Sequence, residues 1–334
     1  MLFRKCFLSI CYFSLISTPV LAQEDEIKAI IKPSKVDEHQ TPVINNSTKK
    51  EEDWVAGFHQ GVANSVYQSA TWFDSFFMDE GDEQISPKTS ARIKLGWEPK
   101  ARDWGEFGTR FKLKVRLPHF KDKVDIIFSD TAEDQFDNLP LETIKTNSDF
   151  DDDSFAAAIR YIFKDNNNFV TDTRLGISGG DIFIRGRHKR TYSWNERHSF
   201  KVEPSLYYYL DDGIGSRLLL EYDYQINATE QYRFNYSIRG SESFNGIRWK
   251  HGFYHLKQIS DHEAAILGLQ AEGERNGDRG FFVDKYTLSY RYRFRALKEW
   301  LYFEVEPLLE FTEEENYKVT PGIALRVEGF FYQE

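Results

Sequence analysis

Apolar and polar side chains alternate with a period of two over most of the chain, from residue 88 onward. In the segment 105–118, apolar side chains fill most odd positions and basic side chains fill the even positions between them. Successive side chains of a strand point to opposite faces, so this alternation predicts a strand with one apolar face. The pattern predicts fourteen strands, with twelve as the alternative count: 89–98, 105–118, 122–130, 154–164, 168–178, 181–192, 198–210, 216–227, 230–240, 246–258, 263–274, 280–295, 300–312 and 317–331.

Short segments rich in turn-forming residues separate these strands and predict hairpins. Most of the strands have the ten or so residues that a tilted strand needs to cross a bilayer. We therefore predict an all-β fold, a transmembrane up-and-down antiparallel β-barrel over 88–334, with an even strand number that leaves both ends in the periplasm. The alternation slips in 181–192 and in 246–258, where we expect a β-bulge.

The region before the barrel has a different period. Apolar side chains from Trp54 to Phe77 recur every three or four residues, which predicts an amphipathic helix within 51–80. This helix would either pack across the base of the barrel or plug its mouth. Residues 23–50 are charged, contain Pro33 and Pro42 and lack an apolar period, so we expect a flexible periplasmic tail there.

The first residues have the order of a secretory signal. Arg4 and Lys5 precede a short apolar run, and small residues predict cleavage after Ala22, so we expect a signal peptide over 1–22 and export to the outer membrane of a Gram-negative cell. Cys6 and Cys11 both lie in this segment. The mature chain would then have no cysteine, which excludes disulfides and thiolate chemistry.

The amino-acid composition limits the classes of molecule that the protein is expected to contact. The formal net charge is −10, which does not favour non-specific binding to nucleic acid. Mean hydropathy is −0.57, which is low enough for a water-soluble protein. This value does not exclude a membrane barrel, because only every second residue of a barrel strand faces lipid. Aromatic residues make up 16% of the chain, and such rings gather at the membrane interfaces of barrels. We expect outer-membrane lipid and lipopolysaccharide as the surroundings, and no cofactor.

The last predicted strand carries a motif. Thr320, Gly322, Leu325 and Val327 are spaced as polar, glycine, hydrophobic and hydrophobic, and Phe331 follows close to the end. This spacing resembles the C-terminal assembly signal of outer-membrane barrels, although Pro321 lies within it and the chain does not end on an aromatic residue. The resemblance implies the barrel-assembly machinery and periplasmic chaperones as partners. The tract 300–329 also resembles an uncharacterised proteobacterial barrel family, which implies no particular activity.

The polar faces of the strands would line the barrel lumen. Turn positions predict cross-strand pairs of opposite charge, namely Arg116–Asp125, Asp223–Arg233, Arg291–Glu306 and Arg293–Glu304. The predicted lumen-lining residues are Arg110, Lys112, Lys114, Arg116, Asp223, Arg233, Arg291, Arg293, Arg295, Glu304 and Glu306. This lining favours a pore for small polar solutes. The alternative is a non-transporting barrel with an envelope-maintenance role, in which the same charges neutralise each other.

Two further hypotheses concern chemistry. The long segment 130–153 is acidic and predicts a solvated extracellular loop, in which Asp151, Asp152 and Asp153 are a weaker hypothesis for a divalent cation site. An outer-membrane lipid hydrolase is the second alternative function. The histidines are scattered along the sequence, and on a strand His251 and His255 would lie too far apart for one metal, so we predict no enzyme activity.

Overall fold

The computed structural model describes residues 73, 76, 89–101, 103–105, 107–120, 123–129, 139–142, 155–166, 169–195, 197–277 and 279–333. Fourteen strands account for most of them, and a short 3₁₀ helix, η1 (Pro118–Phe120), follows the second strand. The strands are β1 (Thr89–Trp97), β2 (Phe107–Arg116), β3 (Val124–Ser129), β4 (Ala156–Asn166), β5 (Phe169–Ser178), β6 (Asp181–Trp194), β7 (His198–Tyr209), β8 (Gly213–Asn227), β9 (Glu230–Ser241), β10 (Gly246–Ser260), β11 (Glu263–Asn276), β12 (Gly280–Arg295), β13 (Leu301–Thr312) and β14 (Val319–Gln333).

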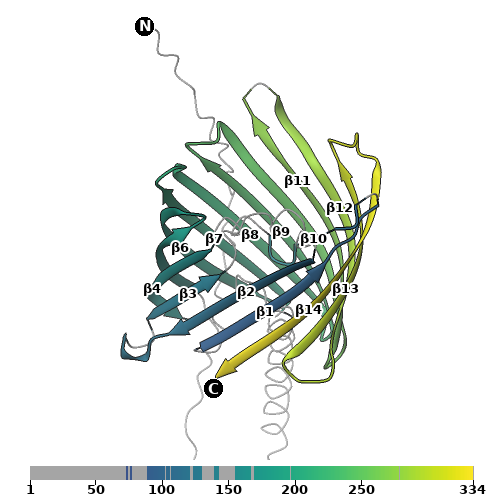
Figure 1. Ribbon diagram of the computed structural model, residues 1–334, viewed down its shortest axis with the longest axis horizontal. Helices are drawn as coiled ribbons and strands as arrows, with labels where there is room; N and C mark the ends of the chain where they lie inside the picture. Colours follow the sequence, from purple (N-terminus) through teal and green to yellow (C-terminus); the bar gives the residue numbers. More distant parts are fainter. Residues whose placement is uncertain are drawn as a thin grey trace, which may run out of the picture. The chain divides into compact units, whose positions relative to one another are not determined.

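These strands form one closed antiparallel barrel, so the predicted fold class and the count of fourteen are confirmed. Each strand pairs with its neighbours in sequence, and β1 pairs with β14 to close the sheet (Figure 1). Thr89 lies opposite Gln333, so the first and last strands begin and end at the same rim. Closure pairs the edges of all strands, which a barrel in lipid requires because no water is present there to satisfy backbone groups.

Alternation of side chains gives the barrel a polar inside and an apolar outside. On β6, Arg185 and Arg187 are buried, whereas Ile182 and Ile184 between them and the turn are about half exposed. The same parity runs through the other strands. The exposed outward side chains include Ile93, Leu95, Phe111, Ile159, Leu175, Leu206, Phe234, Phe253, Leu267, Leu269 and Tyr290. This inverted arrangement is typical of a barrel that presents its outer surface to lipid.

Tight turns set the register of several hairpins. Gly179 and Gly180 join β5 to β6 with φ values of 58° and 86°. Two consecutive positive φ values match the twist of a two-residue hairpin, and glycine adopts them without steric cost.

Register shifts occur at four places: Ile162/Lys164 on β4, Gln225/Asn227 on β8, Gln258/Ser260 on β10, and Glu272/Gly273 in the β11–β12 ladder. The first three lie beside the turn that ends the strand. Within 246–258, β10 pairs with β9 and β11 without a shift, and the bulge expected in that segment lies just beyond it, between Gln258 and Ser260. The bulge expected in 181–192 is wrong, since β6 pairs with β5 and β7 without a shift. The alternation only looked interrupted there, because Gly186 and His188 occupy outward positions that other strands fill with apolar residues.

The expected signal peptide, periplasmic tail and most of the amphipathic helix lie outside the described residues. From the helix, the structure describes Phe73 and Phe76, which are both helical. No helix in the described part of the chain is long and apolar enough to cross a membrane.

Candidate functional site

The inward face of the barrel gathers the charged side chains that the alternation predicts. On β2, the even-numbered side chains Arg110, Lys112, Lys114 and Arg116 share the inward face, opposite inward residues of β1 and β3. Further inward residues are Asp223, Arg233, Arg291, Arg293, Glu304 and Glu306. Arg295 lies at the end of β12 and contacts His262 in the adjacent turn. The barrel interior is therefore a charged surface of both signs.

The cross-strand pairs predicted from turn positions are formed. Each joins a basic group to a carboxylate on the next strand with at least one N···O distance of 3.1 Å or less. The pairs are Arg116–Asp125 (2.8 Å), Asp223–Arg233 (2.7 Å), Arg291–Glu306 (3.1 Å) and Arg293–Glu304 (2.7 Å).

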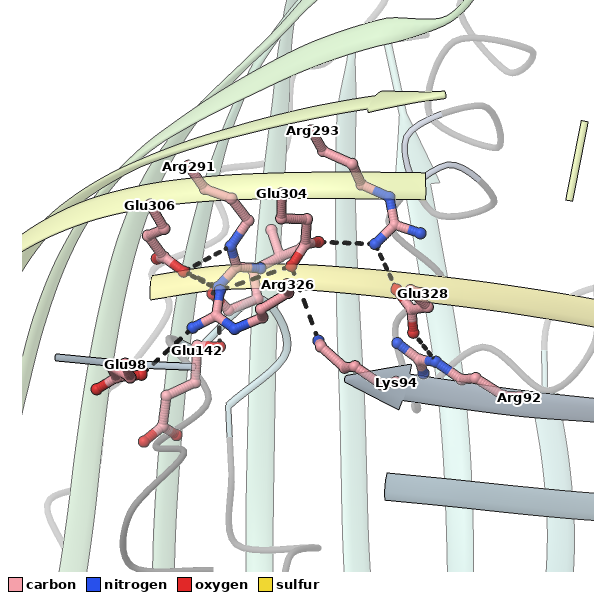
Figure 2. A network of polar contacts seen from close by, with 11 residues as sticks. Arg92, Lys94, Glu98, Glu142, Arg291, Arg293, Glu304, Glu306, Arg326 and Glu328 are labelled. Atoms are coloured by element: carbon pink, nitrogen blue, oxygen red, sulfur yellow. Dashed lines mark hydrogen bonds and ion pairs between the residues drawn. The ribbon is translucent and has the colours of Figure 1, made fainter. Parts of the chain in front are cut away.

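A polar cluster lies where the barrel closes, on β1 and β12–β14. We call it the seam network, and Figure 2 shows its side chains converging from these strands and from the segment that follows β1. Its members are Arg92, Lys94, Glu98, Arg291, Arg293, Glu304, Glu306, Arg326 and Glu328.

One half of the seam network is built around Arg293. Its Nη1 lies 2.7 Å from Oε1 of Glu304 and 2.6 Å from Oε2 of Glu328. The second oxygen of Glu328 accepts a hydrogen bond from Arg92 on β1. The guanidinium of Arg293 also lies over the ring of Tyr302, 4.4 Å from its centroid. A chain of alternating charges thus links β12, β13, β14 and β1.

The other half is built around Arg326 of β14. This guanidinium donates to Glu306 and lies 3.5 Å from Glu304 and 3.6 Å from Glu98. Arg291 contacts the same Glu306 carboxylate from β12. Each carboxylate therefore has more than one basic partner, which a buried ion needs if it is to offset the loss of hydration.

A second network crosses β2–β6. Asp125 is fully buried and lies between Arg116 and Arg160, at 2.8 and 3.2 Å. Arg160 also reaches Asp172, 3.1 Å away, and Arg187 meets the same oxygen at 2.8 Å. The charges on five adjacent strands are thereby connected through two carboxylates.

The segment 139–142, from the connection between β3 and β4, lies against the inward face. Asn235 donates to the carbonyl of Pro140 at 2.9 Å, and Arg291 donates to the carbonyls of Leu141 and Glu142 at 3.4 and 3.1 Å. The Glu142 carboxylate accepts from Lys250 at 2.8 Å.

These contacts correct the expectation of a wholly solvated loop. The acidic composition suggested exposure, but Leu139 and Leu141 are buried, and the wall supplies donors for the segment's carbonyls and for Glu142. Leu141 has a φ of 65°, which strains a residue with a side chain. Such strain persists when surrounding contacts hold it in place. The weaker cation candidates Asp151, Asp152 and Asp153 lie outside the described residues.

An apolar patch also occurs on this polar wall, on β10 and β11. Tyr254, Leu256, Ala264 and Ile266 point inward and are at most 3% exposed. Phe73, Phe76 and Leu141 complete the same cluster. Phe76 meets Tyr302 edge to face, with ring centroids 5.5 Å apart. Two aromatic side chains of the expected amphipathic helix therefore pack on the lumen side of the wall.

The segment after β1 folds over β14. The amide of Ala101 donates to the carbonyl of Pro321, and Lys100 lies 2.8 Å from Glu310 and 3.3 Å from Glu98. Burial disfavours the Lys100 ammonium, but the hydrogen bonds and charges of Glu310 and Glu98 outweigh this effect and raise the pKa of Lys100. Lys100 thus stays charged at neutral pH.

The residues of the C-terminal motif divide between the two faces. Leu325, Val327 and Phe331 face outward, whereas Thr320 and Gly322 share the inward parity of Ala324. Outward hydrophobic residues are compatible with an assembly signal, which stays a prediction. His251 and His255 also face outward, beside Tyr236 and Tyr232. Among the described residues, no group of His, Cys, Asp and Glu side chains is arranged to hold a metal ion.

Sequence reasoning missed the part of the seam network that comes from β1, the segment after it and β14, namely Arg92, Lys94, Glu98, Arg326 and Glu328. Parity alone would have placed Arg326 and Glu328 inward beside Ala324. Their partners were hidden because β1 and β14 are not joined by a turn, so no hairpin sets their register.

No family model and no curated protein matches the sequence. Solved structures that match include the outer membrane channel DcaP of Acinetobacter baumannii (TM-score 0.44, 10% identity, 73% of this chain and 96% of that chain). A loop-deletion mutant of OmpT, an outer membrane protein of Vibrio cholerae, matches at TM-score 0.48 with 7% identity over 74% and 99% of the chains. A bacterial polysaccharide outer membrane secretin matches at 0.45 with 12% identity over 74% and 99%. At TM-scores below 0.5, these matches carry no conclusion about solute or mechanism.

Proposed function

We propose that this chain is an outer-membrane pore for small polar solutes. The observation that carries the proposal is the closed barrel of fourteen strands with an apolar outside and charged inside. A barrel of about eight strands can be filled by its own side chains, whereas one of sixteen encloses a channel, so fourteen strands lie nearer the size of a channel. Outer-membrane lipid and lipopolysaccharide are the proposed surroundings, and the barrel-assembly machinery would recognise the last strand.

Two features would narrow such a pore. Glu142 and its neighbours lie against β9, β10 and β12, and Phe73 and Phe76 pack on the apolar patch of β10 and β11. Small solutes would pass beside these segments, along the charged parts of the wall. This supports a size-selective pore.

Planar-bilayer recording of the refolded mature chain tests the proposal. We expect discrete conductance steps that persist at constant voltage. Their absence, both in the mature chain and in a variant lacking residues 23–80, would contradict the pore.

A non-transporting barrel with an envelope-maintenance role is the second candidate. The observation that favours it is the extent of ion pairing on the inward face, where Arg293, Glu304, Glu306 and Glu328 are each at most 3% exposed. Charges that neutralise each other so completely can close a lumen. The same recordings separate the two functions, because this alternative predicts a folded barrel without conductance.

A further inference from the structure

Two rows of arginines cross neighbouring strands on the inward face. In the first arginine ladder, Arg174 of β5 lies opposite Arg160 of β4 and opposite Arg185 of β6. In the second arginine ladder, Arg239 of β9 lies opposite Arg217 of β8 and opposite Arg248 of β10. Like charges directly opposite each other on paired strands are destabilising. The barrel nevertheless places three arginines side by side in two separate rows.

Tyr207 of β7 links the two ladders. It lies opposite Arg185 in the β6–β7 register, and its hydroxyl accepts a hydrogen bond from Nε of Arg239 at 2.6 Å. The Arg239 guanidinium also lies over the ring, 4.9 Å from the centroid. The glycine opposite Tyr207 on β8, Gly215, makes room for the ring, because a Cβ there would lie 2.2 Å from it. The ladders and Tyr207 thus form a continuous belt across β4–β10.

Basic groups exceed acidic groups on this part of the wall. Arg160 contacts Asp125 and Asp172, and Arg217 donates to Ser237, so the ladders do have polar partners. The inward charged residues of β4–β9 are the basic Arg160, Arg174, Arg185, Arg187, Lys189, Lys201, Arg217, Arg233 and Arg239, against the acidic Asp172, Asp181, Glu203, Glu221 and Asp223. The seam network, by contrast, combines both signs closely.

We infer that the two arginine ladders form an anion-selective lining that binds solutes carrying carboxylate or phosphate groups. The inference rests on the proposed pore. A guanidinium presents donors in a fork that matches both groups in a bidentate manner, and anions passing between like charges relieve their repulsion. Rings of arginine and lysine select anions and phosphates in pores by the same electrostatics.

The test measures the reversal potential of the refolded mature protein in planar bilayers under a KCl gradient. We expect chloride to permeate better than potassium. The double variants Arg174→Gln with Arg185→Gln, and Arg217→Gln with Arg239→Gln, should bring the two permeabilities closer together. A matched pair on one strand controls for the charge change: Arg185→Gln should reduce selectivity, whereas Arg190→Gln on the outward side of β6 should not.

Folding and binding are measured on the same variants. Each double variant removes two opposed arginines and so relieves their repulsion, and the heat-modifiable gel shift should remain. Citrate and inorganic phosphate serve as probes of the two anionic groups. Either should reduce the KCl current and raise the unfolding midpoint of the wild type in detergent, and should do so less in the double variants.

Each outcome decides one of the two claims. Conductance without anion preference overturns the anion-selective lining and leaves the pore intact. Absence of conductance overturns the pore. The lining is then judged in detergent, where equal midpoint shifts in wild type and double variants, or none in the wild type, overturn it as well.

Discussion

Arg293 of β12 and Glu304 of β13 lie directly opposite each other on the inward face, with Nη1 and Oε1 2.7 Å apart. Both side chains are nearly inaccessible, at 1% and 3% exposure. Glu304 also faces Lys94 of β1 and Arg326 of β14, so this pair ties the last hairpin to the closing strands. Changing the charge of either residue should therefore affect the stability of the whole seam network.

Reversing one member of this pair should destabilise the barrel strongly. Arg293→Glu places a third carboxylate beside Glu304 and Glu328, and breaking a buried pair costs about 3–5 kcal/mol. The double variant Arg293→Glu with Glu304→Arg restores the pair and should recover part of this loss. Recovery should be incomplete, because Glu328 and Lys94 then each face a like charge. Urea unfolding and the heat-modifiable gel shift measure both effects.

The control for this prediction is an ion pair at the rim. Lys257 and Glu230 lie 2.9 Å apart, and the Lys257 side chain is 54% exposed. Exposed pairs contribute about 0.2–1 kcal/mol, so reversing either member should change little. Equal destabilisation by reversals at the rim and at Arg293 would contradict this assignment of the seam network. So would a double variant of Arg293 and Glu304 that is no more stable than either single variant.

If the barrel is the proposed pore, removing Phe73 and Phe76 should widen it. Both rings cover the apolar patch that contains Tyr254 and Ile266, so Phe73→Ala with Phe76→Ala should raise the single-channel conductance. Phe253→Ala, which changes an outward side chain of β10, should leave conductance as it is. Unchanged conductance in the double variant would show that these rings do not restrict the path.

The position of segment 139–142 can be tested by crosslinking. The carbonyl of Pro140 lies 2.9 Å from Nδ2 of Asn235, so the pair Pro140→Cys and Asn235→Cys should react with a short thiol crosslinker and shift the gel mobility. The predicted absence of cysteine in the mature chain gives a clean background. Pro140→Cys with Phe234→Cys, the outward neighbour, should not react. Equal reaction of both pairs would mean that the segment does not rest on the wall.

A glycine beside Tyr254 should tolerate no side chain. A Cβ on Gly252 would lie 2.5 Å from Cε2 of Tyr254, which packs across it, so Gly252→Val should destabilise the barrel by about 1–3 kcal/mol. Gly186 has no atom within 4 Å of such a Cβ, and Gly186→Val is the matched control. Urea midpoints compare the two. A larger loss for Gly186→Val than for Gly252→Val would refute this packing.

The strands and most of the hairpin pairing could be predicted from the sequence because both depend on local features. Alternation gives the face of each side chain, and a short turn then sets its partner, as for Arg116 and Asp125. The closure of the barrel could not be predicted in this way. Lys94 lies opposite Glu328, but more than 200 residues separate them and no turn sets their register.

The position of segment 139–142 against the barrel wall also could not be predicted from amino-acid composition. Its surroundings are acidic, which favours solvation, yet Leu139, Pro140 and Leu141 form a short apolar run within them. That run was the available signal. Whether it packs inward depends on donors such as Asn235 and Arg291, which come from strands far along the chain.

The most direct test of the account asks which face of the strands meets lipid. Single cysteines carrying a bimane label at Ile184, Leu206 and Leu267, all outward, are compared with labels at Arg185, Ser205 and Gly268, all inward. The refolded protein is placed in vesicles with brominated acyl chains. The account predicts strong quenching at the three outward sites and little at the three inward ones. Quenching without this alternation, or stronger at the inward sites, would contradict a membrane barrel with a charged lumen.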